Sequence, residues 1–168
     1  MTTRGIIFDM DGLLVDSEKI YYQANIRAAK EMGFDFTPED HHAILGTTDT
    51  YLRNYFKAKL GSATAATEFI DRSYRNVATV VEADGVAIKP GLVDLLDYCD
   101  NQGISRVIAS SNFRSMVDDF MQSTGLQSRF SQIVAGDEVT HGKPNPEIFL
   151  KALDRLALPA PSALVLED

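Results

Sequence analysis

The sequence has a single cysteine, Cys99, among its 168 residues, so it cannot form an internal disulfide. It also lacks any concentrated run of Lys and Arg, and its formal net charge is -8. Such an acidic chain does not suit binding to nucleic acid or to an anionic membrane surface. No stretch approaches the roughly 20 apolar residues of a membrane span, and the first residues lack the pattern of a signal peptide. We therefore expect a cytoplasmic protein that binds neither nucleic acid nor membranes.

Histidine is also scarce. The three histidines, His41, His42 and His141, include no pair with the spacing of metal ligands, so we interpret all three as surface residues. Cys99 falls on the apolar side of a predicted helix and is interpreted as a small buried hydrophobic residue.

Four short apolar runs are present, and each ends in small or acidic residues. Such runs are typical of strands buried in a parallel sheet. They cover residues 5–9, 104–110, 132–136 and 163–168. An amphipathic helical pattern precedes each of the last three runs, with Gly103 and Gly125 as helix stops and Pro146 as a helix start. This alternation predicts an α/β fold with a doubly wound parallel sheet.

Residues 18–85 break that alternation, because they show helical patterns only. Thr37-Pro38-Glu39-Asp40 has the features of a helix N-terminus, and Gly33 and Gly61 follow two of the other predicted helices. The expected helices are 18–32, one beginning near Pro38, 48–60 and 64–81. A purely helical stretch of this length is too long for one crossover between strands. We predict an inserted all-helical domain over residues 17–85, with residues 1–16 and 86–168 forming the catalytic core.

The first predicted strand ends in two carboxylates, Asp9 and Asp11, followed by Gly12, which allows a tight turn. Ligands of doubly wound sheets bind where the strands end, so both side chains would lie at that edge. Two carboxylates there suit Mg²⁺, and they equally suit a nucleophile with a neighbouring acid/base group. The pair alone is a weak signal.

The second predicted strand ends in Ser110, Ser111 and Asn112, directly before a helix. Hydroxyl groups and backbone N–H groups at a helix N-terminus bind phosphate oxygens. Helix capping alone would explain these three residues equally well if they stood in isolation.

The remaining strand ends complete a set suited to phosphoryl transfer. Lys143 follows the third strand and could neutralise a phosphoryl group, and Glu167 and Asp168 add two carboxylates at the end of the fourth. Asp137 and Glu138 end the third strand and are interpreted as turn residues, with a supporting role at the site left open. The whole set is far more specific than any one of its members.

At these residues the sequence resembles the haloacid dehalogenase-like superfamily, in its branch of β-phosphoglucomutase-like phosphatases with a helical cap. Four segments carry the resemblance: FDMDGLLVDSE at 8–18, VIASSN at 107–112, GKPNPEIFLKAL at 142–153 and VLED at 165–168. The resemblance covers the whole chain. It implies a Rossmann-like core with a helical cap and a phosphatase that acts on a small phosphorylated metabolite.

The resemblance also implies catalytic roles. Asp9 would attack phosphorus to form an aspartyl-phosphate, and Asp11 would act as the general acid and then as the general base. Ser110 and Lys143 would hold the phosphoryl oxygens, together with the loop that contains Ser111 and Asn112.

A metal site follows from the same resemblance. Mg²⁺ would be held by Asp9, the backbone carbonyl of Asp11, and Asp168, with Glu167 behind these ligands or bound through water. The presence of Asp11 argues against haloacid dehalogenation, because the resemblance implies that dehalogenases lack this aspartate.

Two other functions stay open. The mutases of this branch carry a histidine where this chain has residues 20–22, Ile-Tyr-Tyr, and an arginine near Asp49, so the residues favour a phosphatase. Arg53 lies close enough to keep the phosphosugar mutase as an alternative. A phospho-accepting receiver module would use similar residues, but it has no helical insert like residues 18–85.

The chain ends at Asp168, on the tip of the last predicted strand. Members of the family continue with further helix and strand, so we expect a longer natural protein and an uncovered face on this strand. A catalytically impaired fragment is therefore a further interpretation. For the oligomeric state, which the sequence does not determine, a monomer is slightly favoured.

Overall fold

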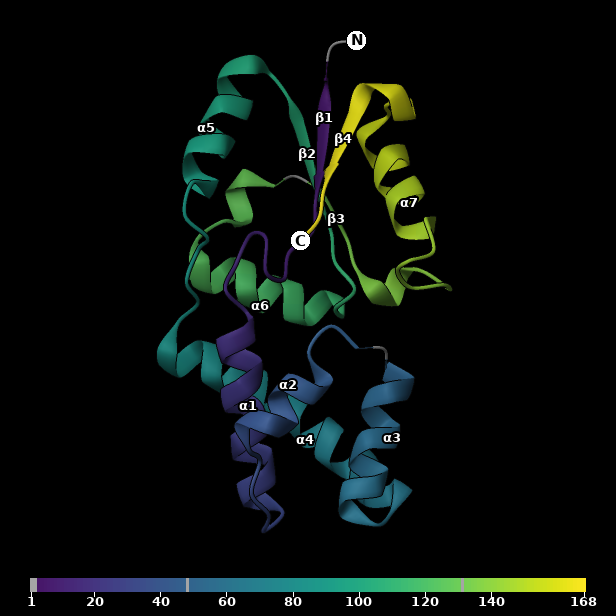
Figure 1. Ribbon diagram of the computed structural model, residues 1–168. Helices are drawn as coiled ribbons and strands as arrows, with labels where there is room; N and C mark the ends of the chain where they lie inside the picture. The colour runs from purple at the N-terminus through teal and green to yellow at the C-terminus, as the bar shows by residue number, and fades with distance from the viewer. Residues whose placement is uncertain (1–2, 48, 131) are drawn as a thin grey trace. The chain divides into compact units, whose positions relative to one another are not determined.

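The computed structural model describes residues 3–47, 49–130 and 132–168 (Figure 1). The chain divides into two compact units. Met1–Ser17 and Gly85–Asp168 form one, here called the sheet unit, and Glu18–Asp84 form the other, the helical unit. These limits lie close to the predicted boundaries. The roles of catalytic core and cap remain predictions.

The sheet unit is built on four parallel strands in the order β3-β2-β1-β4. They are β1 (Gly5–Phe8), β2 (Ser105–Ala109), β3 (Gln132–Val134) and β4 (Ala163–Leu166). In register, Gly5 of β1 lies beside Ser105 on one side and Ala163 on the other. All four strands fall within the predicted runs, and the predicted α/β fold is confirmed.

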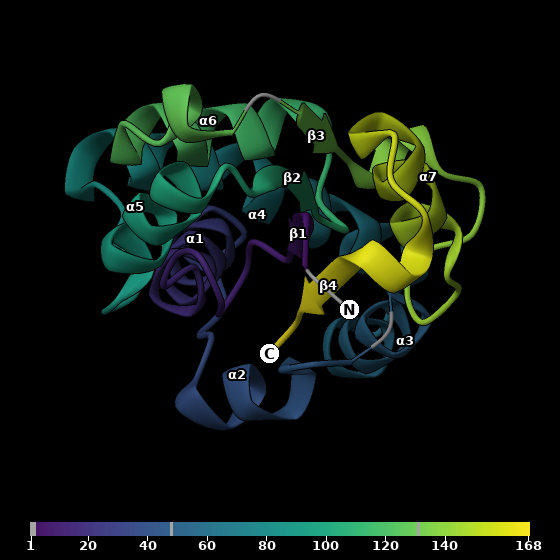
Figure 2. The same ribbon diagram turned by 90° about the horizontal axis from the view of Figure 1, so that it is seen from above.

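Helices cover the two faces of this sheet, which explains the continuous apolar runs. Figure 2 shows α5 (Leu92–Gln102) and α6 (Arg114–Thr124) on one side and α7 (Glu147–Leu156) on the other. On the α7 side a buried cluster joins strand and helix side chains: Ile7, Val107, Ala109, Val134, Ile148 and Ala152. The edge strand β4 is different, because Leu164 is 47% exposed and Val165 is also exposed.

The helices of the sheet unit begin and end at the predicted start and stop residues. Gly103 and Gly125 are the C-caps of α5 and α6 and adopt left-handed backbone angles, with φ of 63° and 69°. Pro146 occupies the N-cap of α7. Short 3-10 turns complete the unit: η1 (Gln127–Arg129), η2 (Gly136–Glu138) and η3 (Ala160–Ser162). Cys99 is buried in α5 and free, as predicted.

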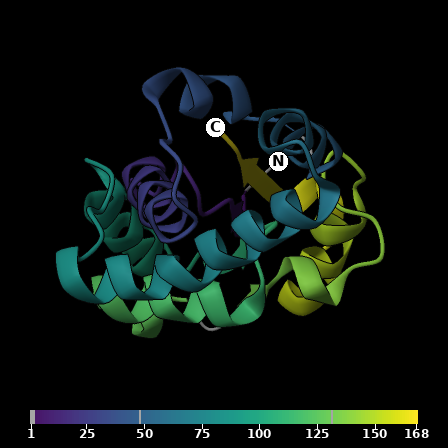
Figure 3. The same ribbon diagram turned by 90° about the horizontal axis from the view of Figure 1, so that it is seen from below.

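The helical unit contains α1 (Glu18–Glu31), α2 (Pro38–Ile44), α3 (Asp49–Leu60) and α4 (Ala63–Asp84), and α4 packs along α1 and α3 (Figure 3). Phe36, Phe56 and Phe69 lie at the centre of its core. The predicted N-terminus of α2 is confirmed: Thr37 and Asp40 form a reciprocal capping box. The predicted helix start at Thr48 lies outside the described residues, and α4 extends beyond the predicted 64–81. Within the described ranges no helix is both long and apolar enough to cross a membrane.

The prediction that all three histidines are surface residues is wrong for His41. This residue is 8% exposed, and its ring lies 4.7 Å from that of Tyr22 between centroids. Its Nε2 lies 3.3 Å from Glu18 Oε1, while its buried Nδ1 has no hydrogen-bond partner among the residues that the structure describes. Imidazole packs among aromatic rings as a flat, partly apolar body, which helical spacing alone did not reveal. His42 and His141 are exposed, as predicted.

Candidate active site

The turn after β1 brings the first carboxylates to the carboxyl edge of the sheet. Asp9 is 6% exposed, and its backbone N–H donates to the Leu166 carbonyl at 2.9 Å. Gly12 has a φ of 70°, and a Cβ there would lie 2.0 Å from Asp168 Oδ2. Glycine is therefore required both for the left-handed turn and for the close approach of the Asp168 carboxylate.

Lys143 joins the ends of two different strands. Its Nζ donates to Asp9 Oδ1 at 2.6 Å and to the two carboxylate oxygens of Glu167 at 3.0 and 3.1 Å. The ammonium also lies 5.2 Å from the centre of the Phe149 ring, a distance suited to a cation–π contact. Three predicted site residues from distant parts of the sequence therefore meet at one point.

The electrostatics of Asp9 are unusual for an ion-paired carboxylate. Burial raises the pKa of Asp9, and the hydrogen bond and charge of Lys143 only partly oppose this effect, leaving the pKa at about 6. The nearby Glu167 charge raises it further. One lysine shared by two carboxylates does not fully compensate the buried negative charge, so this site favours additional positive charge.

The loop after β2 contacts Asp11, the second acidic residue after β1. Ser110 is fully buried, and its Oγ accepts a hydrogen bond from the Asn112 backbone N–H at 3.2 Å. The Asn112 side chain donates through Nδ2 to Asp11 Oδ2 at 2.6 Å. Ser111 is exposed at the outer side of this loop. The predicted phosphate-binding residues and the predicted acid/base residue are thus joined by a direct hydrogen bond.

The predicted metal ligands are brought to this edge, but not as one cluster of side chains. Among the described residues, no group of three His, Cys, Asp or Glu side chains could hold a metal ion. The predicted set needs only two side-chain carboxylates, those of Asp9 and Asp168, with the backbone carbonyl of Asp11. These hard oxygen donors fit the preferences of Mg²⁺, and the metal site remains a prediction.

Two contributors to the site were missed from the sequence. Glu147 accepts hydrogen bonds from the backbone N–H groups of Thr140 and His141 at 2.7 and 3.0 Å, and it also contacts the His141 ring. It thereby orders the loop that leads to Lys143. Phe149 lies beneath the lysine ammonium. Both residues belong to the segment 142–153 that carried the resemblance, but their side-chain directions could not be inferred from spacing.

Sequence comparisons agree with this geometry. A family model described as haloacid dehalogenase-like hydrolase matches residues 6–168. Protein CbbY of Rhodobacter capsulatus is 32% identical over 177 residues, covering 100% of this chain and 78% of that protein. The phosphorylated carbohydrates phosphatase of Thermotoga maritima is 29% identical over 163 residues, covering 97% and 75%.

Solved structures show the same fold. A Thermotoga maritima protein assigned as a β-phosphoglucomutase has a TM-score of 0.80 at 29% identity, covering 99% of this chain and 76% of that one. CbbY of Rhodobacter sphaeroides has a TM-score of 0.83 at 24% identity, covering 99% and 78%. The family match over residues 6–168, together with the parallel sheet and its paired Asp9 and Lys143, establishes that this chain belongs to the haloacid dehalogenase-like hydrolase family.

Proposed function

We propose that this chain carries the active site of a Mg²⁺-dependent phosphatase that hydrolyses a small phosphomonoester through an aspartyl-phosphate on Asp9. The observation that carries the proposal is the contact of Lys143 Nζ with Asp9 Oδ1 at 2.6 Å, beside an Asp11 side chain joined to the Ser110–Asn112 loop. A buried carboxylate, a lysine, a hydroxyl and a second carboxylate are the groups that phosphoryl transfer requires.

In the first step, a carboxylate oxygen of Asp9 attacks phosphorus while the bond from phosphorus to the ester oxygen breaks. Asp11, in its acid form, gives its proton to the leaving oxygen, which departs as an alcohol. Lys143 and Ser110 hold the phosphoryl oxygens during this transfer. With a pKa of about 6, Asp9 is mostly ionised at neutral pH and able to attack.

In the second step, water attacks the phosphorus of the aspartyl-phosphate. Asp11, now a carboxylate, takes the proton from that water, and the bond between Asp9 and phosphorus breaks to release inorganic phosphate. Both residues return to their starting states. Division into two transfers replaces one difficult displacement by two easier ones.

Mg²⁺ fits the residues present, since Gly12 leaves room for the Asp168 carboxylate beside the turn that holds Asp9. It would be held by the Asp9 and Asp168 carboxylates and the Asp11 carbonyl, with Glu167 behind these ligands or bound through water. When bound, it would neutralise charge on the phosphoryl oxygens and orient them.

A small phosphorylated metabolite is the substrate class we propose, because the acidic chain does not favour polyanionic macromolecules. A relative at 29% identity is described as a phosphorylated carbohydrates phosphatase, which supports a sugar phosphate within that class. The mutase alternative draws on the Thermotoga maritima structure assigned as a β-phosphoglucomutase.

Hydrolysis of an aryl phosphate, with and without Mg²⁺, tests the proposal. The wild-type chain should turn over only with Mg²⁺, and Asp9→Asn should abolish turnover. Asp154→Asn provides the matched control, because it makes the same chemical change at an exposed position on α7. Activity that survives Asp9→Asn would refute the role of Asp9. Phosphoryl exchange between glucose 1-phosphate and a bisphosphate primer, without net hydrolysis, would establish the mutase instead.

A further inference from the structure

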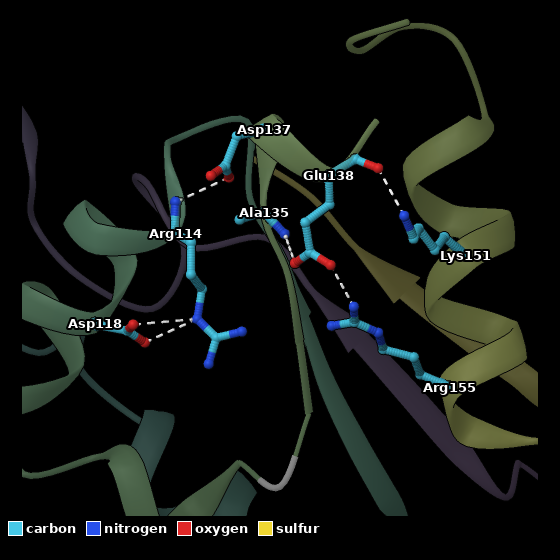
Figure 4. Close-up of polar contacts among 7 residues, drawn as sticks. All are labelled: Arg114, Asp118, Ala135, Asp137, Glu138, Lys151 and Arg155. Atoms are coloured by element: carbon cyan, nitrogen blue, oxygen red, sulfur yellow. Dashed lines mark hydrogen bonds and ion pairs between the residues drawn. The ribbon is translucent and has the colours of Figure 1, made fainter. Parts of the chain in front are cut away.

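The segment Ala135–Glu138, which follows β3, contacts the two helices that come directly after the loops with the proposed phosphate-binding residues. Figure 4 shows Asp137 directed toward the start of α6 and Glu138 directed toward α7. The helix α6 follows the Ser110–Asn112 loop, and α7 follows the loop that contains Lys143. None of the residues 135–138 has a role in the proposed reaction. The hydrogen bonds that they make to α6 and α7 therefore point to a different role.

Gly136 holds the Ser110–Asn112 loop by backbone contacts. Its N–H donates to the Asn112 carbonyl at 2.7 Å. A Cβ at this position would lie 2.1 Å from the Ser111 carbonyl oxygen, so no other residue fits without displacing the loop. The loop is therefore packed directly against the segment after β3.

Asp137 contacts the backbone of Arg114, which lies just after that loop in the sequence. Its Oδ1 accepts a hydrogen bond from the Arg114 backbone N–H at 3.0 Å, at the first residue of α6 (Figure 4). The N-cap residue of α6 itself, Phe113, provides no side-chain cap. Asp137 thus supplies from another part of the chain an acceptor that most helices obtain from their own N-cap.

Glu138 anchors the same segment to α7. Its carboxylate accepts the Ala135 backbone N–H at 3.0 Å and pairs with Arg155, while its backbone carbonyl accepts from Lys151 Nζ at 2.6 Å (Figure 4). Asp137 therefore directly precedes a residue that is held by three contacts. Its carboxylate can then define where α6 begins.

We propose that Asp137 is a positioning residue for the phosphate-binding loop. It fixes the start of α6, and together with Gly136 it holds Asn112 in place to contact both Ser110 Oγ and Asp11 Oδ2. This inference rests on the proposed function, since it assigns Asp137 a part in orienting the groups that bind phosphate and deliver the proton. Asp137 itself does not touch the substrate.

The test measures the binding of inorganic phosphate, in the presence of Mg²⁺, by calorimetry and as competitive inhibition of aryl phosphate hydrolysis. Asp137→Ala should weaken phosphate binding about three- to tenfold, the equivalent of one lost cap. Asp137→Asn should restore affinity to within about twofold, because an amide oxygen still accepts from Arg114. Asp118→Ala is the matched control: it removes a partner of the Arg114 side chain and spares the hydrogen bond of the Arg114 backbone N–H.

Amide hydrogen exchange over residues 110–116 gives a readout that does not depend on turnover. It should accelerate in Asp137→Ala and stay at the wild-type rate in Asp118→Ala. Wild-type phosphate affinity in Asp137→Ala, or equal loss in Asp137→Ala and Asp137→Asn, would overturn the positioning role. A wild-type chain that binds phosphate with the expected response to Asp137→Ala, yet hydrolyses no ester, would overturn the proposed function and leave this inference supported.

Discussion

Each unit of this molecule contains a buried aspartate paired with a lysine, and the two pairs behave in opposite ways. Lys143 contacts Asp9 at 2.6 Å in the sheet unit, and Lys59 contacts Asp40 at 2.5 Å in the helical unit. The pKa of Asp9 is raised to about 6, while that of Asp40 is lowered to about 2. The distance from the carboxylate to the lysine therefore does not decide whether the pKa of the aspartate is raised or lowered.

Burial, hydrogen-bond donors and neighbouring charges together explain the difference: desolvation has the largest effect on the pKa of Asp9, and the donors outweigh desolvation only at Asp40. Burial raises the pKa of Asp40 too, but donors from Lys59, the Thr37 backbone and the Tyr55 hydroxyl outweigh it. Asp9 shares its lysine with Glu167, whose charge raises the pKa further, and hydrogen bonds from Lys143 and the Met10 backbone only partly oppose the effect of burial. The charged form of Asp40 is thus stabilised by its donors, and the pair stabilises the fold. Asp9 instead keeps a raised pKa, which is common for titratable groups at functional sites.

The largest contrast is expected from replacing each aspartate by asparagine. Asp9→Asn should lower turnover by at least about 10³-fold, because the nucleophile is lost, and should leave the fold as stable or more stable, because a costly buried charge is removed. Asp40→Asn should do the reverse. It should cost about 2 kcal/mol of stability and retain most of the turnover in the folded fraction.

Aryl phosphate turnover and urea unfolding, measured on both variants and on Asp154→Asn, provide the check. If Asp9→Asn destabilised the chain as much as Asp40→Asn, the two pairs would be equivalent structural ion pairs and the contrast would be lost.

Replacing the lysines should sharpen the same contrast. Lys143→Met should raise the pKa of Asp9 further and lower turnover about 10²-fold or more, since both charge neutralisation and phosphoryl binding are lost. Lys59→Met should mainly lower the free energy of unfolding, by about 1–3 kcal/mol, because Asp40 remains buried without its cation. Calorimetry of phosphate binding distinguishes the two variants, because only Lys143→Met should lose affinity for phosphate. Normal phosphate affinity in Lys143→Met would contradict the account.

Acid should weaken the helical unit through Asp40. The folded pKa of Asp40, about 2, lies below its ordinary value of 3.8, so its stabilisation is present above about pH 4 and is lost as the pH falls toward 2. The expected loss is about 1–2 kcal/mol, after allowing for the partly exposed Lys59. Urea unfolding between pH 5 and 2 should show this slope in the wild type and a smaller one in Asp40→Asn. Equal slopes would mean that Asp40 is not the titrating group.

The smallest effect is expected from Tyr55→Phe, which removes one donor to Asp40 and preserves the ring. We expect a loss of about 1 kcal/mol and a rise in the pKa of Asp40 toward its ordinary range. Carboxyl titration followed by NMR, with Tyr51→Phe on the same helix as control, measures both. An unchanged Asp40 pKa would show that the Tyr55 hydroxyl does not help to lower it.

The elements of the fold could be read from the sequence because their signals are local. Continuous apolar runs marked all four strands, and Gly103 and Gly125 marked two helix ends. Asp9 and Lys143 could be placed together because parallel strands end at one edge. That rule requires no knowledge of side-chain packing.

Features that depend on side-chain direction could not be predicted. His41 was taken as a surface residue but is buried among aromatic rings, and the alternation of polar and apolar residues gives no warning of this. The pairing of Asp40 with Lys59 joins two helices, and the link from Asp137 to Arg114 joins a 3-10 turn to the first residue of α6. Such contacts are set by tertiary packing, which sequence spacing does not encode.

The most direct test of the central claim is to trap the phosphoryl group on the enzyme. A short incubation with aryl phosphate and Mg²⁺, followed by borohydride reduction, converts a phosphorylated aspartate to homoserine, which mass spectrometry locates in the peptide. The account predicts homoserine at position 9 in the wild type and Asp154→Asn, and none in Asp9→Asn. Homoserine at another position, or turnover with Asp9 unmodified throughout, would contradict it.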